Sequence, residues 1–147
     1  ATRLTETEFM VRAANSDLFE IQTGRLAAGK GMTAEVRALG QHLVTDHTAS
    51  STELKALAAQ KNITLPDSLS VDKRTIRVRL AAETGKTFDQ DFATTQIAAH
   101  DEAISLYQQA SSELQDPEIK AFATKILPNL QMHREHAVQV KTKTDAL

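Results

Sequence analysis

Four polar side chains occupy positions where a helical core stripe would normally carry apolar or small residues. His47 and His133 each replace an aliphatic residue in a stripe of three-four spacing, and His100 stands at the edge of a third stripe. Glu20 lies on a fourth stripe, nearer the start of the chain. Imidazole nitrogens suit Zn, Cu, Fe and Ni, and a carboxylate adds negative charge. Each stripe therefore offers one side chain that can coordinate a transition-metal ion.

The spacing of these residues along their helices is compatible with one common layer. Glu20 lies about nine residues before the first interhelical turn and His47 about fourteen after it, so their Cα atoms differ in height by roughly 7 Å. Side chains lean toward the N-terminus of their own helix, and in an antiparallel pair both leanings shorten this gap. His100 and His133 are offset by only about two residues relative to their own turn, or roughly 3 Å.

Two further residues extend the predicted site. His136, one turn beyond His133, is a further candidate ligand, and Asp46 is expected to orient an imidazole of another helix by accepting a hydrogen bond. His42 falls off its stripe and is expected in solvent. The sequence lacks the paired Glu-x-x-His motifs of di-iron carboxylate sites. We therefore predict a single ion, either Zn, Fe or Cu, without a predicted reaction.

A second interpretation needs no metal. A histidine in a helical core is commonly a hydrogen-bonded core residue, and Glu20 would then form a salt bridge with a protonated histidine. The polar layer would be structural, in a non-catalytic interaction module of the cell envelope. A third interpretation, an oxidase or peroxidase that uses the metal, ranks lowest. The sequence has no Gly-rich phosphate loop, G-x-S-x-G or H-E-x-x-H motif.

The residues that would position this site form four long helical patterns. They run over about Thr5–Gly29, Thr33–Lys61, Thr87–Leu114 and from Asp116 onward. Short links join the first to the second and the third to the fourth, and one long link joins the two pairs. This pattern predicts an all-α fold, a ferritin-like four-helix bundle, as one domain over residues 1–147.

Helix ends are predicted from capping residues. Thr5 and Thr87 are each followed by a glutamate or glutamine three residues later, which is the pattern of a capping box. Asp116 precedes a proline, which suits the first helical position. Gly29 and Gly31 are expected to end the first helix in the left-handed conformation.

The long link, over about residues 65–85, is expected to hold a short extra helix in the crossover. Asp67 or Ser70 is its predicted cap, and Gly85 is expected to close it. The segment carries four basic residues between Lys73 and Arg79. They form either a phosphate or partner site or, as is more typical of a charge run, a solvated face.

Composition excludes several classes of protein. The chain has 147 residues, 41% of them hydrophobic and 24% charged, a formal net charge of −2 and no cysteine. Thiolate metal sites and disulfides are thus excluded, and the charge gives no basis for nucleic-acid binding. No apolar run reaches membrane-spanning length. The start at Ala1 suits a mature exported protein whose signal peptide has been cleaved, or a trimmed chain. We expect a monomer or a homodimer.

Several short segments follow one another in an order typical of a known family. They are Phe9 with Ala13–Ala14 and Glu20, Leu26–Ala27, Val44–Thr45–Asp46–His47, Leu54–Leu57–Ala58, Gly85-x-x-Phe88–Asp89, His100, Phe122–Ala123, and Leu127–Pro128 followed by His133. In these segments the chain resembles the bacterial ferritin-like family catalogued as domain of unknown function 4142. The resemblance spans nearly the whole chain, and its specificity lies in the order and spacing of the segments.

The resemblance implies a four-helix ferritin-like fold and periplasmic or other export. For many members it also implies a stress-associated role in the envelope. The family's polar positions correspond here to Glu20, Asp46, His47, His100 and His133. Phe92 departs from the pattern, which often has a tyrosine at this place after Phe-Asp. We therefore predict a bundle that binds a metal ion in the cell envelope.

Overall fold

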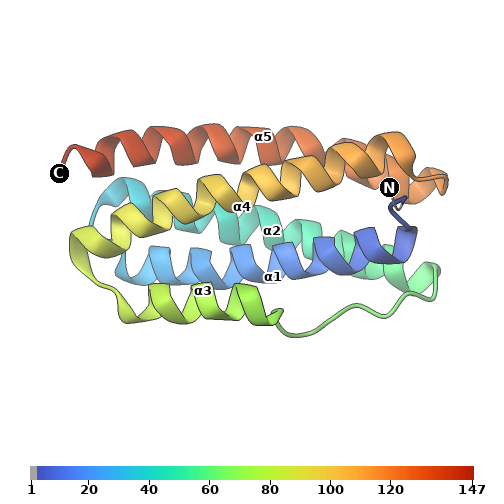
Figure 1. The fold of residues 1–147 in the computed structure, drawn as a ribbon, viewed down its shortest axis with the longest axis horizontal. Coiled ribbons are helices and arrows are strands. Elements are labelled where there is room, and N and C mark those ends of the chain that lie inside the picture. Colours follow the sequence, from blue (N-terminus) through green and yellow to red (C-terminus); the bar gives the residue numbers. More distant parts are fainter. Residues whose placement is uncertain (1–2) are drawn as a thin grey trace.

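The chain folds into helices joined by short links and one long crossover (Figure 1). The computed structural model describes residues 3–147, and no strand occurs in that range. The helices are α1 (Glu6–Lys30), α2 (Ala34–Gln60), α3 (Val71–Ala82), α4 (Gly85–Glu113) and α5 (Pro117–Asp145). The prediction of an all-α four-helix bundle with a short extra helix in the crossover is confirmed.

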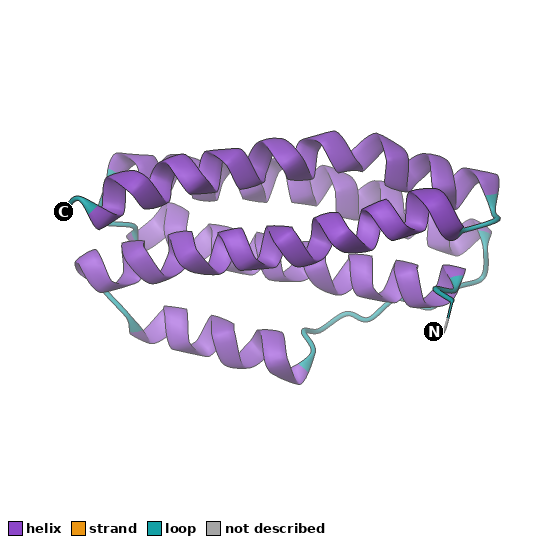
Figure 2. Ribbon diagram, turned by 45° about the horizontal axis from the view of Figure 1, so that its top comes forward, coloured by secondary structure: helices purple, strands orange, loops and turns teal. Residues whose placement is uncertain are grey.

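The four long helices form two antiparallel hairpins. α1 packs against α2 and α4 against α5, and the hairpins meet along α1 with α4 and α2 with α5. The crossover returns the chain along the bundle, so α2 and α4 run in the same direction (Figure 1). α3 lies outside the four long helices (Figure 2), against α1 and α4. This connectivity, with one long crossover, is that of ferritin-like bundles.

Three of the predicted helix ends are confirmed. The Thr5 hydroxyl oxygen accepts the backbone N–H of Glu8 at 3.1 Å, and Thr5 is the N-cap of α1. Asp116 caps α5, with Pro117 as the first helical residue. Ser70, one of the two expected caps, precedes α3, but its hydroxyl accepts a hydrogen bond from Asn15 rather than from its own helix.

Three predicted helix ends are wrong. Gly85 does not close α3, which ends at Ala82 with Glu83 as its C-cap, and is instead the first residue of α4. Thr87 does not cap α4, because Gly85 adopts a φ of 60° and lets the helix begin three residues earlier, after Thr84. Gly29 lies within α1, and Gly31 ends that helix at a φ of −55° rather than in the left-handed region. The turn after Gly31 is held from outside: Asp89 on α4 accepts the backbone N–H groups of Met32 and Thr33, each at 2.8 Å.

The core consists of two apolar clusters separated by a polar layer. One cluster includes Phe9, Leu54, Tyr107 and Phe122, and the other includes Val36, Leu43, Phe88, Phe92 and Val140. Each long helix passes from one cluster to the other and contributes polar side chains where it crosses. The buried polar residues of this layer are Asp17, Glu20, Thr23, His47, Ser50, Ser51, Gln96, His100 and His133.

A close helix crossing beside this layer fixes α1 against α2. A Cβ atom at Gly40 would lie 2.6 Å from the carbonyl oxygen of Gly24 and 2.7 Å from the backbone nitrogen of Ala28. Both are backbone atoms, so they cannot move aside as a side chain can. The absence of side chains at these two glycines therefore sets the α1–α2 separation next to the polar layer.

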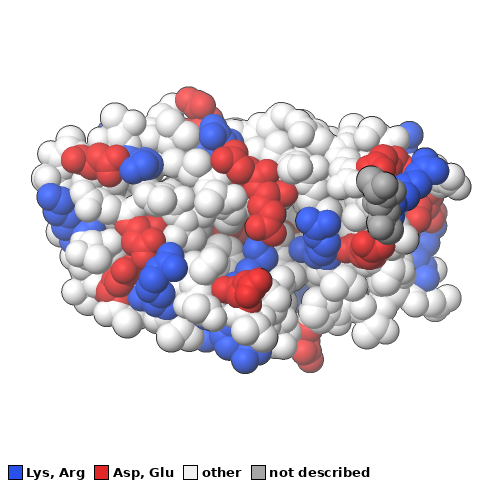
Figure 3. Space-filling view, in the orientation of Figure 1, with Lys and Arg blue, Asp and Glu red and all other residues white. Residues whose placement is uncertain are grey.

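The surface carries both signs of charge. Lys and Arg are interspersed with Asp and Glu on the face seen in Figure 3. Two of the basic crossover residues are engaged within the chain, since Arg79 pairs with Asp91 at 2.8 Å and Lys73 lies 5.0 Å from the ring centroid of Phe19. None of the helices in residues 3–147 combines the length and apolarity that a membrane crossing requires.

The helix crossing yields a paired prediction. Gly40→Ala should destabilise the protein by about 1–3 kcal/mol, because the added methyl group forces two backbones apart. Gly29→Ala is the matched control: nothing lies within 4 Å of its Cβ position, so it should be neutral or stabilise by up to about 1 kcal/mol. Urea unfolding of both variants checks this. Equal stability of the two would show that the crossing tolerates a side chain.

Candidate metal centre

Three buried histidines from three helices meet in the polar layer. His47 on α2, His100 on α4 and His133 on α5 are 3%, 1% and 2% exposed. One ring nitrogen from each can be chosen so that all three lie within 4.8 Å of one another. Ring centroids are 6.0 Å apart for His47 and His100, 5.4 Å for His47 and His133, and 5.7 Å for His100 and His133. We call these residues the histidine trio.

Each ring of the trio is held through one of its two nitrogens. His47 Nδ1 lies 2.8 Å from Asp17 Oδ1, and His133 Nε2 lies 2.7 Å from Asp46 Oδ2. His100 Nδ1 lies 2.8 Å from the backbone carbonyl oxygen of its own helix, at Gln96. In a neutral ring held by an acceptor, the held nitrogen carries the proton, and the other nitrogen has a free lone pair.

The second nitrogen of each ring is buried and unpaired. Among residues 3–147, His47 Nε2, His100 Nε2 and His133 Nδ1 have no hydrogen-bond partner. A buried polar atom without a partner costs about 1–3 kcal/mol, so three of them in one layer form an unusual and costly arrangement. Metal–nitrogen bonds of about 2.0–2.1 Å place ligand nitrogens roughly 3.3–3.6 Å apart. For one nitrogen from each ring within 4.8 Å of the others, a closure of little more than about 1 Å would reach that separation.

Glu20 lies beside the trio but outside the group of converging donor atoms. Its Oε2 is 3.2 Å from His100 Nδ1, the nitrogen that already faces a carbonyl oxygen. Its other oxygen, Oε1, is buried and has no partner within the described chain. The structure thus brings Glu20 into the layer, against the outer nitrogen of His100. Its predicted role as a direct ligand stays a prediction.

Burial and mutual charge set the protonation of the layer. Burial raises the pKa of Glu20 to about 7, although His47 and Gln96 act to lower it. Burial, followed by the charge of His47, lowers the pKa of His100 and that of His133 to about 4 each. Burial also acts to lower the pKa of His47, but the hydrogen bond of Asp17 and the charge of Glu20 outweigh it and raise that pKa.

These pKa directions define the Glu20–His100 contact. An ion pair would lower the pKa of the carboxyl group and raise that of the imidazole, and here both shifts have the opposite sign. The contact is therefore not an ion pair, and the hydrogen bond of His100 Nδ1 goes to the carbonyl oxygen of Gln96. His47, beside Asp17, is the ring that most readily carries a proton.

The remaining predicted site residues fall into two places. Asp46 contacts His133, an imidazole of another helix, which is the geometry that the sequence predicted for it. His136 lies outside the trio and packs against His42, with ring centroids 5.6 Å apart. Burial, followed by the charge of His42, lowers the pKa of His136. His42 is exposed, as its place off the stripe predicted.

Sequence reasoning missed Asp17. Asp17 is 2% exposed, whereas its neighbour Ser16, whose spacing to Ala13 and Glu20 is equally suitable for an inner stripe, is only half-buried. The usable signal was spacing: Asp17 lies four residues after the buried Ala13 and three before Glu20, so one helix face holds all three. On α4, Gln96 and His100 both face the core, whereas the sequence placed His100 only at the edge of its stripe.

The chain belongs to the family described as a domain of unknown function, DUF4142, whose model matches residues 1–140. The resemblance stated from the sequence segments is thereby confirmed. Among curated proteins, none matches the sequence of this chain.

Solved structures share the fold. A DUF305 fragment from Deinococcus radiodurans has a TM-score of 0.83 at 12% identity, over 94% of this chain and 95% of that one. CopM in its Cu(I)-bound form has a TM-score of 0.78 at 17% identity, over 96% and 98% of the two chains. CopM in its Cu(II)-bound form has a TM-score of 0.75 at 16% identity, over 97% and 99%. At these identities the similarity establishes the helical-bundle fold.

The lowered pKa values of His100 and His133 predict acid sensitivity of the metal-free protein. Both groups favour the neutral form on folding, so their contribution to stability is present above about pH 6.5 and is lost as pH falls through about 4. Glu20 acts in the opposite sense, since a raised pKa contributes stability at low pH that is lost as pH rises through about 7.

Urea unfolding between pH 4 and 7, with chelator present, separates these contributions. His133→Gln should lose less stability toward acid than the parent protein, because one of the two depressed groups is gone. Glu20→Gln should lose more, because the opposing carboxyl group is gone. Glu102→Gln, an exposed glutamate on the same bundle, is the matched control and should follow the parent. A Glu20→Gln profile parallel to that of the control would contradict the assignment.

Proposed function

We propose that this protein binds one transition-metal ion at the histidine trio and serves to hold or buffer that ion. Two observations carry the proposal: three histidines from three helices each offer a ring nitrogen within 4.8 Å of the others, and each of these rings has one buried nitrogen without a partner. Three imidazoles suit Cu and Zn, and also Fe. A bound ion would take the three unpaired nitrogens as ligands, displacing the proton that His47 most readily carries, and so remove their desolvation cost.

The second layer of contacts supports this proposal. Histidines that bind metals generally donate their other N–H group to a carboxylate or a backbone carbonyl oxygen, which fixes the tautomer and the ring orientation. Asp17, Asp46 and the carbonyl oxygen of Gln96 are such acceptors here, one for each ring. Glu20 would add a negative charge near the ion and hold the outer nitrogen of His100.

The metal-free structural layer is the weaker candidate. It was expected to contain Glu20 in a salt bridge with a protonated histidine. The imidazole that Glu20 contacts is that of His100, and the pKa directions of these two groups are opposite to those of an ion pair. The imidazole whose pKa is raised, that of His47, is bonded to Asp17 instead. A structural layer would also satisfy its buried atoms, because an unpaired polar atom in a core is destabilising. In the trio, one nitrogen of each ring has a partner and the other has none.

Copper is the ion that we favour. The donors alone do not distinguish copper from zinc, but CopM shares the fold and is described in Cu(I)-bound and Cu(II)-bound forms. We further propose that the chain is exported and handles metal in the cell envelope, as its family resemblance implied. The supporting observation is compositional: a site built without cysteine thiolates tolerates an oxidising compartment.

Loss of a ring should abolish metal binding. Chelator-stripped protein without an affinity tag should take up one Zn(II) per chain in equilibrium dialysis and melt at a higher temperature, because an ion that binds only the folded state adds stability. His47→Ala and His133→Gln should lose both effects. His42→Ala, which removes an exposed histidine one turn before Asp46 on α2, should retain both effects. Unaltered zinc content in the two trio variants would refute the site.

The outer contacts should tune affinity rather than stoichiometry. Asp17→Asn keeps the shape of the side chain but weakens the acceptor for His47 Nδ1, so zinc affinity should fall about 10-fold to 100-fold while one ion still binds. Asp67→Asn changes an exposed aspartate in the crossover before α3 and should leave affinity unchanged. Competition against a fluorescent zinc indicator measures both variants, and equal affinities would show that Asp17 does not support the ligand.

A further inference from the structure

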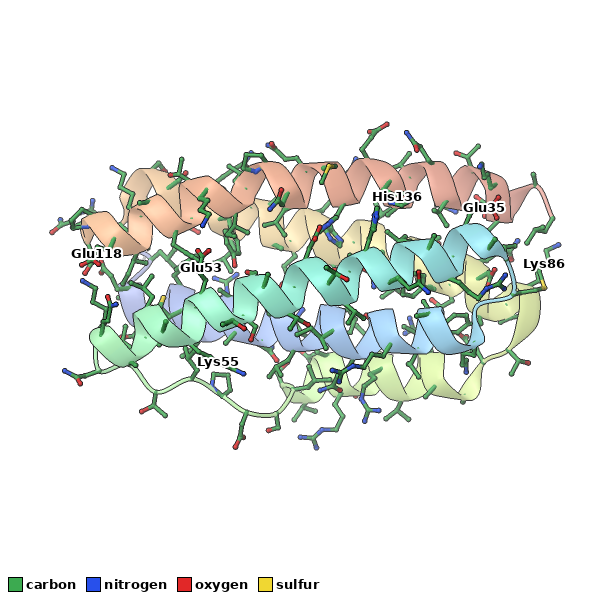
Figure 4. All side chains as sticks on the ribbon, turned by 180° about the vertical axis from the view of Figure 1, so that it is seen from behind. Glu35, Glu53, Lys55, Lys86, Glu118 and His136 are labelled. Carbon is green, nitrogen blue, oxygen red and sulfur yellow. The ribbon has the colours of Figure 1, made fainter. Side chains whose placement is uncertain are left out.

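A second histidine pair lies on the surface directly beside the trio. His42 on α2 and His136 on α5 face each other with ring centroids 5.6 Å apart and ring planes at 70°. Figure 4 shows His136 pointing from α5 toward α2. Both residues line a surface pocket of about 440 Å³, whose wall also includes Met132, Glu135 and His133 of the trio.

The helix register produces this pair. α2 and α5 are antiparallel, and Asp46 on α2 contacts His133 on α5. A step of four residues back along α2 gives His42, and a step of three residues on along α5 gives His136. Residues three or four apart share a helix face, so His42–His136 forms the next contact along the same interface.

The chemistry of the pocket suits a soft, monovalent ion. Two imidazole nitrogens about 4 Å apart can hold an ion between them at about 2.0 Å from each, and a ring-centroid distance of 5.6 Å is close to what such a bridge requires. Met132, one turn before His136 on α5, presents its thioether at 58% exposure. Thioether ligands select Cu(I), whereas Zn(II) in proteins takes three or four nitrogen, oxygen or thiolate ligands.

From this geometry we propose that His42, His136 and Met132 form a solvent-accessible Cu(I) site through which the ion reaches the trio. His133 belongs to both places: it lines the surface pocket, and its unpaired Nδ1 lies in the buried layer. Binding of Cu(I) at the surface does not depend on the buried site. The role in loading does, and it therefore rests on the proposed function.

Cu(I) titration of the full chain tests the surface site. Under anaerobic conditions with ascorbate and a chromophoric Cu(I) chelator as competitor, the parent protein should bind two ions. His42→Ala and His136→Ala should each bind one, and His47→Ala should retain the surface ion. In His47→Ala, the ring Cε1–H signals of His42 and His136 should shift in NMR spectra upon addition of Cu(I).

Three results would overturn the surface site. One is that His42→Ala and His136→Ala both bind two ions with unchanged affinity. Another is that Zn(II) added to His47→Ala shifts the same two ring signals with an affinity equal to that of Cu(I). The third concerns Met132→Leu, which keeps the side-chain volume but removes the sulfur. When it is combined with His47→Ala, the Cu(I) affinity should fall about tenfold or more, and an unchanged affinity would overturn the site.

A rate measurement tests the loading role separately. Transfer of Cu(I) from the chelator to the trio should slow at least about tenfold in His42→Ala and His136→Ala, with the final occupancy of the trio unchanged. An unchanged rate would overturn the loading role. If the parent protein instead binds one ion that His136→Ala loses and His47→Ala keeps, the surface site stands and the buried site fails.

Discussion

An imidazole ring has two nitrogens, and the structure depends on satisfying only one of them in each of three buried histidines. Asp17, Asp46 and a backbone carbonyl oxygen hold the outer nitrogens of His47, His133 and His100. The inner nitrogens remain unpaired and buried. Orienting contacts that leave an unpaired lone pair on every ring have an energetic cost, and a shared cation is the simplest group that offsets that cost at all three rings.

The rest of the bundle is arranged around that layer. Apolar clusters lie on both sides of it along all four long helices, so the layer is enclosed at both ends. The Gly24–Gly40 crossing sets α1 against α2 within a turn of the layer, and Asp89 ties α4 to the turn between α1 and α2. Because the donors come from three helices, the site exists only when both hairpins are docked. Ion binding should therefore be coupled to the docked, folded state.

The comparisons separate fold from function. Structures at 12–17% identity share this helical bundle nearly end to end, and two of them, both of CopM, are described with copper bound. A shared fold accommodates many functions, so metal binding by this chain depends on its own residues. The surface pair of His42 and His136 illustrates this point, since it follows from the register of two helices and from the residues that this sequence places there.

The sequence alone determined the fold class, the four long helices and the residues that interrupt their apolar stripes. These features depend on local spacing and capping, which are readable without tertiary contacts. It placed His47 and His133 on inner faces correctly and predicted that Asp46 would contact an imidazole of another helix.

The tertiary structure decided the rest. Which ring nitrogen is held, and which is unpaired, depends on partners that are distant in sequence, as with Asp17 and His47. Asp17 and Ser16 are neighbours on α1, so a rotation of the helix about its axis by roughly 100° or less would exchange which of them is buried. Only packing against α2 chooses between them. Likewise, packing of α5 against α2 placed His136 beside His42 rather than in the trio. The register between two helices depends on their packing, and the spacing of residues within either helix does not predict it.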